Sequence, residues 1–206
     1  MIQPLYQPPN RHPMKYFSIV SLVMCLFLAI LGNNAMSESN PKVQFETTKG
    51  NIVLELDAEK APKTVENFLT YVNSGHYDGT IFHRVIPSFM IQGGGFDAEM
   101  NQKPTNNPIE NEANNGLKNV KGSISMARTS VPHSATAQFF INVVDNAMLD
   151  FTSESPQGWG YAVFGQVTEG LDVVLAIEEV ATGNSGMHQN VPLEPIVIQK
   201  ATVVSQ

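Results

Sequence analysis

The chain has 206 residues, of which 42% are hydrophobic and 15% are charged, a composition typical of a globular protein rather than a disordered one. Its formal net charge of −7 disfavours a general nucleic-acid-binding role, because phosphate contacts need a basic face. Cys25 is the only cysteine, so a mature chain that begins beyond it has no thiol for disulfides, nucleophilic catalysis or Cys-ligated zinc.

An apolar segment near the N-terminus has the features of a secretory signal peptide. A lysine precedes fifteen uncharged residues, 17–31, and this run is short for a membrane span of about 20 apolar residues. Small residues follow, and we expect cleavage after Ser37 or, as the neighbouring alternative, after Ala35. Residues 1–37 are therefore predicted to be an N-terminal extension and signal peptide, with Met14 as an alternative start. The competing interpretation is an uncleaved segment that anchors the protein to the membrane.

The elements of the remaining chain follow from its apolar periodicity. Alternating apolar residues predict a β-hairpin with strands at 42–47 and 51–56. Residues 61–73 are predicted to form a helix, since apolar residues from Val65 to Val72 recur at i, i+3, i+4 and i+7. Later strands are predicted at 81–86, 89–93, 123–127, 139–143, 161–167 and 196–204, and a second helix at 171–180.

The spaces between these elements predict loops and one closed domain. Residues 98–119 and 152–160 are rich in turn-forming residues and are predicted to be long loops. Glu178 and Glu179 are interpreted as the solvated end of the second helix. Many short strands with only two helices favour an all-β fold, a closed barrel capped by two helices. We expect residues 38–206 to form this single domain and to be monomeric.

Three segments carry the strongest functional signal. They are 82–96 (FHRVIPSFMIQGGGF), 122–142 (GSISMARTSVPHSATAQFFIN) and 161–165 (YAVFG). In this order they resemble the signature segments of the cyclophilins, and the resemblance extends from about Lys42 to Val204. MARTS and NEANNGLKN resemble bacterial members more than eukaryotic ones.

This resemblance implies both a fold and an activity. The fold is a closed antiparallel eight-stranded β-barrel with two capping helices, and the activity is peptidyl-prolyl cis/trans isomerisation without metal or cofactor. The expected partners are unfolded or proline-containing polypeptides, with no nucleic acid and no stable membrane contact after signal cleavage. Together with the signal peptide, the bacterial resemblance predicts a periplasmic protein that accelerates the folding of exported chains.

The chemistry of X-Pro isomerisation explains why an arginine is the central residue. Rotation breaks amide resonance over a barrier of about 20 kcal/mol, but no covalent bond is made or broken. In the twisted transition state the proline nitrogen gains a localised lone pair, and a fixed donor aimed at it binds this state better than the planar one. By resemblance Arg84 is that donor. From composition alone, a surface or salt-bridged arginine is the alternative.

The resemblance also assigns the residues around Arg84. The catalytic set is Arg84, Phe89 and Gln92, and the substrate-binding set is Met90, Ala127, Arg128, Gln138, Phe140, Met148, Leu149 and Tyr161. Phe89, Met90, Phe140 and Leu149 would form the apolar pocket for the proline ring, although taken singly such residues more often belong to a core. Gln92 and Gln138 would bind the substrate backbone, or would instead satisfy buried backbone groups. The backbone of Ala127 and Arg128 would pair with the residues before proline.

Two positions depart from the pattern of the family. Met148 occupies the position of a Trp that in eukaryotic cyclophilins donates a hydrogen bond to the inhibitor cyclosporin, and Met has no such donor. We therefore predict weakened cyclosporin binding with isomerase activity retained. Tyr161 occupies the position of the family's pocket histidine, and its ring can still form a wall of the pocket.

Competing functions have weaker support in the sequence. His83 and the other histidines show no HExxH spacing, the glycines at 93–95 lack the context of a dinucleotide loop, and no GxSxG elbow is present. The main alternative is a proline-segment binding module or chaperone with little turnover. Arg84 together with Phe89 and Gln92 favours the enzyme, because a pure binder needs no donor aimed at the amide nitrogen.

Overall fold

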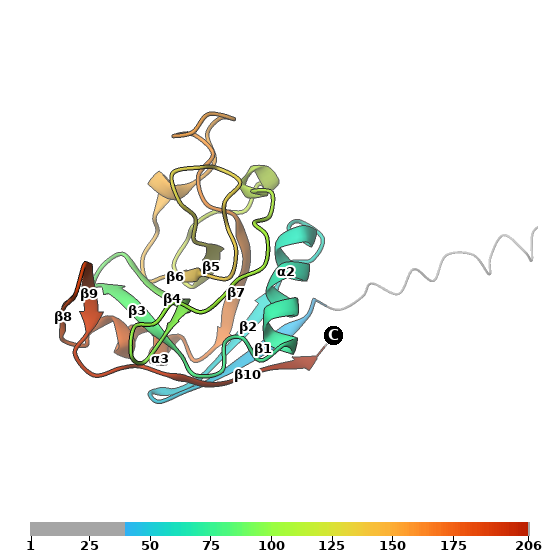
Figure 1. The fold of residues 1–206 in the computed structure, drawn as a ribbon. Helices are drawn as coiled ribbons and strands as arrows, with labels where there is room; N and C mark the ends of the chain where they lie inside the picture. Colours follow the sequence, from blue (N-terminus) through green and yellow to red (C-terminus); the bar gives the residue numbers. More distant parts are fainter. Residues whose placement is uncertain (1–39, 206) are drawn as a thin grey trace, which may run out of the picture. The chain divides into compact units, whose positions relative to one another are not determined.

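The computed structural model describes residues 40–205 (Figure 1). The predicted signal peptide, its cleavage site and the alternative anchor lie outside the described residues. Within this range the strands are β1 (Lys42–Thr47), β2 (Gly50–Leu56), β3 (Thr80–Ile86), β4 (Met90–Asp97), β5 (Ser123–Met126), β6 (Phe139–Asn142), β7 (Val163–Glu169), β8 (Thr182–Ser185), β9 (His188–Pro192) and β10 (Ile198–Ser205). The helices are α2 (Pro62–Asn73) and α3 (Leu171–Glu178), with short 3-10 helices η1 (Ala113–Asn115) and η2 (Ala147–Leu149).

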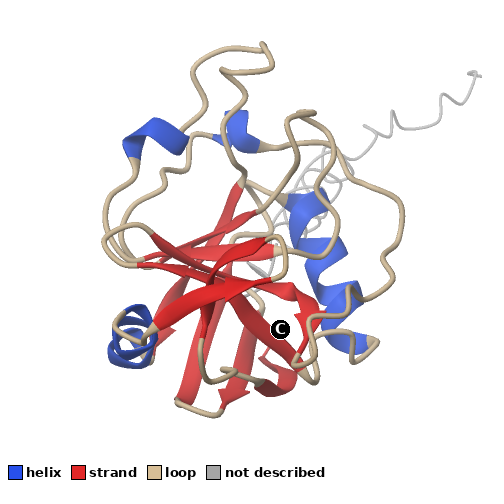
Figure 2. Cartoon of the chain, turned by 60° about the vertical axis from the view of Figure 1, so that its left-hand side comes forward, coloured by secondary structure: helices blue, strands red, loops and turns tan. Residues whose placement is uncertain are grey.

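Eight of these strands form one antiparallel sheet that closes on itself. Their order is β10-β1-β2-β7-β5-β6-β4-β3. The two edge strands meet, since Ile81 of β3 forms a bridge with Val197 and the amide of Phe82 donates to the carbonyl of Ile196 at 3.0 Å. Closure leaves no long edge unpaired. The closed eight-stranded barrel implied by the resemblance is confirmed, and Figure 2 shows its strands wrapping around the core.

The core contains an aromatic cluster that the alternating strands turn inward. Val43 and Phe45 of β1 are fully buried, as the alternation of that strand predicts. Phe45 stacks on Phe139 of β6 with ring centroids 5.3 Å apart, and Phe68 of α2 lies 5.0 Å from Phe164 of β7. These rings join three strands and one helix into a single packed interior.

The two α-helices lie on opposite sides of the barrel in Figure 2. Helix α2 begins with Pro62, and it buries the predicted apolar face, including Val65 and Phe68. The long loop that follows β4 supplies hydrogen-bond acceptors to the first turn of this helix. The Glu112 carboxylate accepts from the amide and the hydroxyl of Thr64 at 2.8 and 2.7 Å. A carboxylate at a helix N-terminus complements the helix dipole. The loop is therefore anchored to the helix.

Three features differ from the sequence prediction. The β8–β9 hairpin was not predicted, because the segments TGNS and HQNVP show neither alternation nor an apolar run. Strand β4 continues to Asp97 rather than ending at Gly93. Glu178 is not solvated: it is 8% exposed and contacts a turn of the site described below. In the described part of the chain, no helix combines the length and apolar character needed to cross a membrane.

Candidate active site

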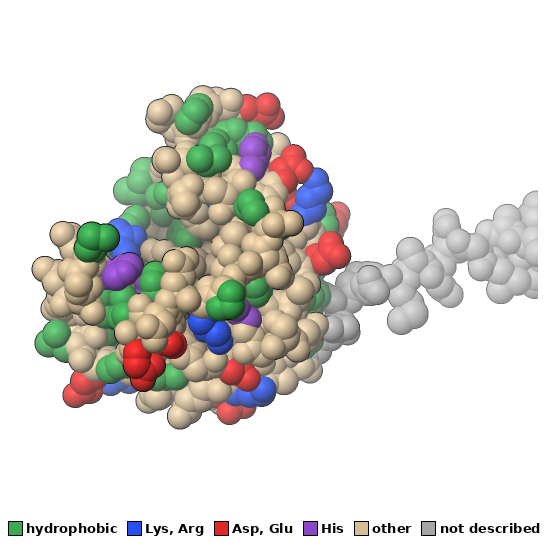
Figure 3. Space-filling view, viewed as in Figure 1, with side chains coloured by type: hydrophobic (Ala, Val, Ile, Leu, Met, Phe, Trp, Pro, Cys, Tyr) green, Lys and Arg blue, Asp and Glu red, His purple; other side chains and the backbone are tan. Residues whose placement is uncertain are grey.

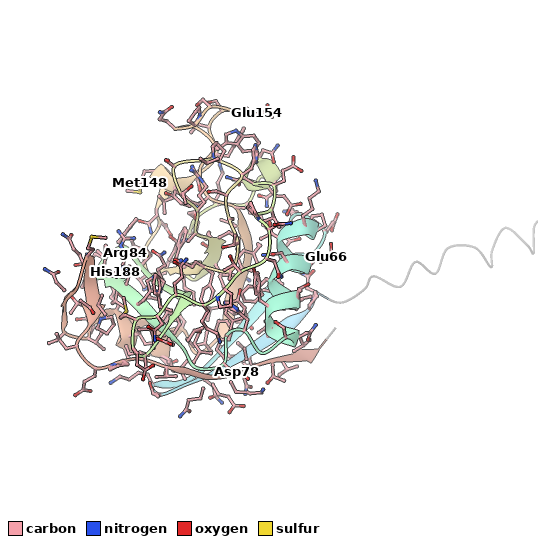
Figure 4. The ribbon with its side chains drawn as sticks, in the orientation of Figure 1. Glu66, Asp78, Arg84, Met148, Glu154 and His188 are labelled. Atoms are coloured by element: carbon pink, nitrogen blue, oxygen red, sulfur yellow. The ribbon has the colours of Figure 1, made fainter. Side chains whose placement is uncertain are left out.

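A cavity of about 200 Å³ opens on the barrel surface and brings together nine of the eleven predicted site residues. Its lining residues are Arg84, Phe89, Met90, Gln92, Ala127, Arg128, Phe140, Leu149 and Tyr161. Figure 4 shows Arg84 between the labelled Met148 and His188, and Figure 3 shows hydrophobic side chains gathered around a basic one in that region. The other two predicted residues, Gln138 and Met148, do not line the cavity.

Strand register explains why residues distant in sequence meet here. In the β3–β4 hairpin, Arg84 lies opposite Gln92, and in the β4–β6 pair, Gln92 lies opposite Phe140. Directly opposed residues of neighbouring antiparallel strands share one face of the sheet. Met90 lies two residues from Gln92 and so shares that face. Arg84, the side-chain amide of Gln92 and two apolar side chains thus form a patch across three strands.

A hydrogen-bond chain orients the guanidinium of Arg84. Its Nη1 donates to Oε1 of Gln92 at 3.2 Å, and Nε2 of Gln92 donates to Oε1 of Gln138 at 3.0 Å. Gln138 packs directly over Gly95, where an added Cβ would lie 2.6 Å from its side-chain carbons. Gln138 therefore supports Gln92 from behind the cavity. Among residues 40–205, no carboxylate forms an ion pair with Arg84.

Arg128 contributes its side chain to the site, whereas the sequence predicted a role only for its backbone. Its guanidinium carbon lies 4.7 Å from the centroid of the Tyr161 ring, within cation–π range. Its Nε donates to the carbonyl of Gly160 at 2.8 Å. Tyr161 in turn meets Phe140 edge to face, with ring centroids 5.5 Å apart. The tyrosine ring is thus held as a wall between a cation and an apolar ring.

The loop between Leu149 and Tyr161 is closed at its base. The amide of Tyr161 donates to the carbonyl of Leu149 at 2.9 Å. A Cβ at position 160 would lie 2.6 Å from that carbonyl oxygen, so the close approach requires Gly160. Trp159 packs against Phe151, with ring centroids 5.5 Å apart, and belongs to the loop rather than to the cavity. The two wall residues at the base of the loop are thereby fixed relative to each other.

The turn that carries Phe89 is held from two sides by residues that the sequence analysis did not place in the site. The amide of Ser88 donates to Oε1 of Glu178 at 2.6 Å, which corrects the interpretation of Glu178 as a solvated helix end. The carbonyl of Phe89 accepts from Nδ2 of Asn146 at 2.8 Å and from the amide of Val143 at 3.2 Å. No local pattern could reveal either contact, because the partners lie 90 and 57 positions apart in sequence.

His83 lies beside Arg84 in sequence but faces the interior. It is 5% exposed, and its ring lies 4.7 Å from that of Phe96. Burial, with a further contribution from the charge of His188, lowers the pKa of His83 from 6.5 to about 4. Its ring is therefore neutral at pH 7. Residues 40–205 contain no group of three or more His, Cys, Asp or Glu side chains arranged to hold a metal.

Comparison with known proteins assigns the family. The model of the cyclophilin type peptidyl-prolyl cis-trans isomerases matches residues 42–203. The chain belongs to this family. Its fold is similar to the crystal structure of a Cryptosporidium parvum cyclophilin type peptidyl-prolyl cis-trans isomerase, with a TM-score of 0.64 and 27% identity over 81% of this chain and 99% of the other.

Bacterial relatives of this cyclophilin match it over most of its length. It is 65% identical over 162 residues to peptidyl-prolyl cis-trans isomerase cyp18 of Streptomyces antibioticus, covering 79% of this chain and 98% of the relative. It is 62% identical over 161 residues to isomerase B of Escherichia coli, covering 78% and 98%. Isomerase A of Dickeya dadantii is 52% identical over 188 residues, covering 91% and 97%. The predicted resemblance to bacterial members is confirmed.

In this cyclophilin Met148 lies at the rim of the site rather than inside it. The side chain is 77% exposed and belongs to η2, whose next residue, Leu149, lines the cavity. A thioether offers no N–H or O–H donor at this position. The prediction on cyclosporin therefore stands as a prediction, with an exposed and donor-free side chain where the eukaryotic pattern has Trp.

Proposed function

We propose that Arg84 performs the isomerisation catalysed by this cyclophilin, a peptidyl-prolyl cis-trans isomerase, by donating to the prolyl nitrogen. We propose further that the clients are exported polypeptides. The observation that carries the first part is the position of Arg84: it lines the same cavity as Phe89, Met90 and Phe140, and its orientation is fixed by Gln92. This position in the cavity supports a role for Arg84 in binding a ligand.

The proposed mechanism is differential binding of the twisted bond. In the planar X-Pro amide the nitrogen lone pair is delocalised, so a donor gains little from it. As the bond twists, the lone pair localises on nitrogen, and the guanidinium of Arg84 stabilises that developing electron density. Lowering the barrier by about 7 kcal/mol would accelerate rotation roughly 10⁵-fold. The protein needs only to orient its donor.

The cavity floor supplies the complementary apolar surface. Met90 and Phe140 are 2% and 4% exposed, so these two apolar side chains present little of their surface to solvent. A proline ring placed on it leaves the amide in surroundings of low polarity, where the charge-separated planar resonance form is disfavoured. Phe89 and Leu149 would close the pocket on two sides. The ring would thus stay fixed while the residue before proline rotates.

Main-chain groups beside the cavity would bind the residues before proline. Strand β5 ends at Met126, and the amide of Ala127 already donates to the carbonyl of Gln138 at 2.9 Å. The groups that remain for a substrate are the carbonyl of Ala127 and the main chain of Arg128. Gln92, which accepts from Arg84, would offer its side chain to the substrate backbone as well. This arrangement binds an extended peptide with little regard to its side chains.

Support for export comes from the N-terminal sequence and from one comparison. Residues 40–206 are 167 of 206 residues, or 81% of the chain, whereas the match to the Dickeya dadantii isomerase A covers 91% of it. That match therefore includes part of residues 1–39, which contain the apolar segment. We propose that this segment directs the enzyme to the periplasm, where it accelerates a folding step that otherwise takes tens of seconds or more.

The decisive test of the mechanism compares Arg84→Ala with wild type in a protease-coupled X-Pro assay. We expect kcat/KM to fall at least about tenfold, a loss of about 1.4 kcal/mol of transition-state stabilisation. Lys60→Ala, which removes an exposed cation outside the cavity, is the matched control and should keep wild-type turnover. Equal rates for Arg84→Ala and wild type in folded protein would remove Arg84 from the mechanism.

The test of location is the intact mass of the protein recovered from the periplasmic fraction. Cleavage after Ser37, or after Ala35, is the expected result. An uncleaved chain in the membrane fraction would instead support the anchor.

A further inference from the structure

The last residue of helix α3, Glu178, occupies a position that the helix itself does not favour. A carboxylate at a helix C-terminus lies at the negative end of the helix dipole. Burial adds a desolvation cost, and Glu178 is 8% exposed. Among the described residues no lysine or arginine forms an ion pair with it. The stability of α3 therefore does not explain a glutamate here.

The contact that Glu178 makes lies outside its own helix. Its Oε1 accepts a hydrogen bond from the amide of Ser88 at 2.6 Å, across 90 positions of sequence. Its target belongs to the β3–β4 turn, immediately before Phe89. The Glu178 carboxylate thus binds the turn between β3 and β4, which carries the cavity residue Phe89.

The backbone of this turn needs an external partner. Ser88 has a φ angle of 57°, which lies in the left-handed region that residues other than glycine rarely adopt. Such strain persists only where the surroundings hold it, and it concentrates at functional sites. The amide of Phe89 closes the turn by donating to Ile86 at 3.2 Å, and Glu178 holds the adjoining amide. The hydrogen bond from Ser88 therefore holds the strained conformation in place.

We infer that Glu178 is a positioning residue for the isomerase reaction: through Ser88 it fixes the turn so that the Phe89 ring forms the pocket wall before substrate arrives. This inference rests on the proposed role of Phe89 in binding the proline ring. Asn146 holds the carbonyl side of Phe89 at 2.8 Å, and Glu178 holds the preceding amide. Because the pocket wall is held on both sides before binding, little conformational entropy is lost there when the ligand binds.

Two substitutions at Glu178 distinguish the effect of its side-chain length from the effect of its charge. Glu178→Gln keeps the length and an acceptor oxygen but loses the charge. Glu178→Asp keeps the charge, but its shorter side chain cannot reach the amide of Ser88 without movement of the helix. Glu179→Ala removes the neighbouring exposed carboxylate and is the matched control. Ile177→Ala removes a fully buried side chain of the same helix without touching Ser88, and so reports a general loss of stability.

The readouts are turnover and the exchange of one amide. We expect Glu178→Asp to lower kcat/KM about tenfold and to accelerate hydrogen exchange at the Ser88 amide at least about tenfold, since exchange reports local opening. Glu178→Gln and Glu179→Ala should stay within about twofold of wild type in both measurements. Ile177→Ala should lower the melting temperature but keep its turnover well below that temperature.

Two results would overturn the inference. One is wild-type turnover in Glu178→Asp despite rapid exchange at Ser88, because the turn would then be released without consequence. The other is an equal loss in Ile177→Ala and Glu178→Asp at matched stability. Phe89→Ala keeps the two proposals distinct: if it also retains full turnover, the assigned pocket wall is wrong, whereas low turnover in Phe89→Ala beside full turnover in Glu178→Asp contradicts only the role of Glu178.

Discussion

The side-chain amide of Asn146 donates a hydrogen bond to the main-chain carbonyl of Phe89 at 2.8 Å. Asn146 also immediately precedes η2, and its own carbonyl accepts from the amide of Leu149 at 2.8 Å. Phe89 and Leu149 line the cavity from different elements. One buried asparagine therefore sets the spacing of two pocket walls.

Replacing Asn146 should affect both stability and activity. In Asn146→Ala the carbonyl of Phe89 loses its side-chain partner, and we expect the free energy of unfolding to fall by about 1–3 kcal/mol. Turnover should fall as well, because the two walls are no longer tied together. Denaturant unfolding and the X-Pro assay measure the two effects. Asn114→Ala, at an exposed position of η1, is the control and should change neither.

Arg128 should affect substrate binding more than the chemical step. Arg128→Ala removes the cation from the Tyr161 ring and the donor to the carbonyl of Gly160. A cation–π contact contributes about 0.5–1 kcal/mol at an exposed site, so we expect the Kd for a proline peptide to rise about two- to fivefold when the Tyr161 wall is no longer held. Calorimetric titration measures this change. A fall in kcat as large as that of Arg84→Ala, with Kd unchanged, would contradict the assignment.

Cyclosporin provides a test of Met148. The wild-type enzyme should be inhibited weakly, because this exposed side chain has no donor for the inhibitor. Met148→Trp should strengthen inhibition about two- to tenfold, which corresponds to one added hydrogen bond, while turnover of a short X-Pro peptide stays close to wild type. Nanomolar inhibition of the wild-type enzyme would show the prediction to be wrong.

The stability of the protein should fall as the pH drops below 6.5. Burial lowers the pKa of His83 from 6.5 to about 4, so between these values the unfolded chain binds a proton that the folded chain does not. Stability is therefore complete above pH 6.5 and is lost progressively toward pH 4, by up to about 3 kcal/mol. Burial also lowers the pKa of His76, which acts with the same sign.

The variant that isolates this effect is His83→Gln. Its unfolding free energy should depend less steeply on pH between 6.5 and 4 than that of wild type, while His76 and the carboxylates contribute equally to both proteins. Turnover between pH 7 and 8 should be flat in wild type, because the ring of His83 is neutral throughout that range. Parallel pH profiles for the two proteins would exclude His83 as the source.

Much of the fold and of the site could be predicted because their signals are local. Alternation in 42–47 and 51–56 and the apolar face of 61–73 give β1, β2 and α2 with bounds close to those of the structure. Except for Leu149, the cavity residues lie in the three segments whose order resembles one family. The β8–β9 hairpin could not be predicted, since polar strands stabilised by a neighbouring strand have no periodicity of their own.

What the sequence conceals is contact between distant residues. Glu178 looks like an ordinary acidic helix end, and only the folded chain shows that it meets Ser88. Arg128 has the same limitation, because its stacking on Tyr161 depends on how the loop of 150–160 returns to the barrel. Which residues hold the site in place depends on the tertiary fold, whereas a local motif identifies only the residues of the site itself.

The bridge between Ile81 and Val197 has a consequence for how the enzyme is made. The strand that carries Arg84 gains its outer backbone partners from residues 196–198, and β1 likewise pairs with β10. Such long-range pairing is slow to form. Under the proposed export, a chain threaded N-terminus first across a membrane cannot close this sheet until β10 has also crossed, so the isomerase becomes complete only after its own passage has ended.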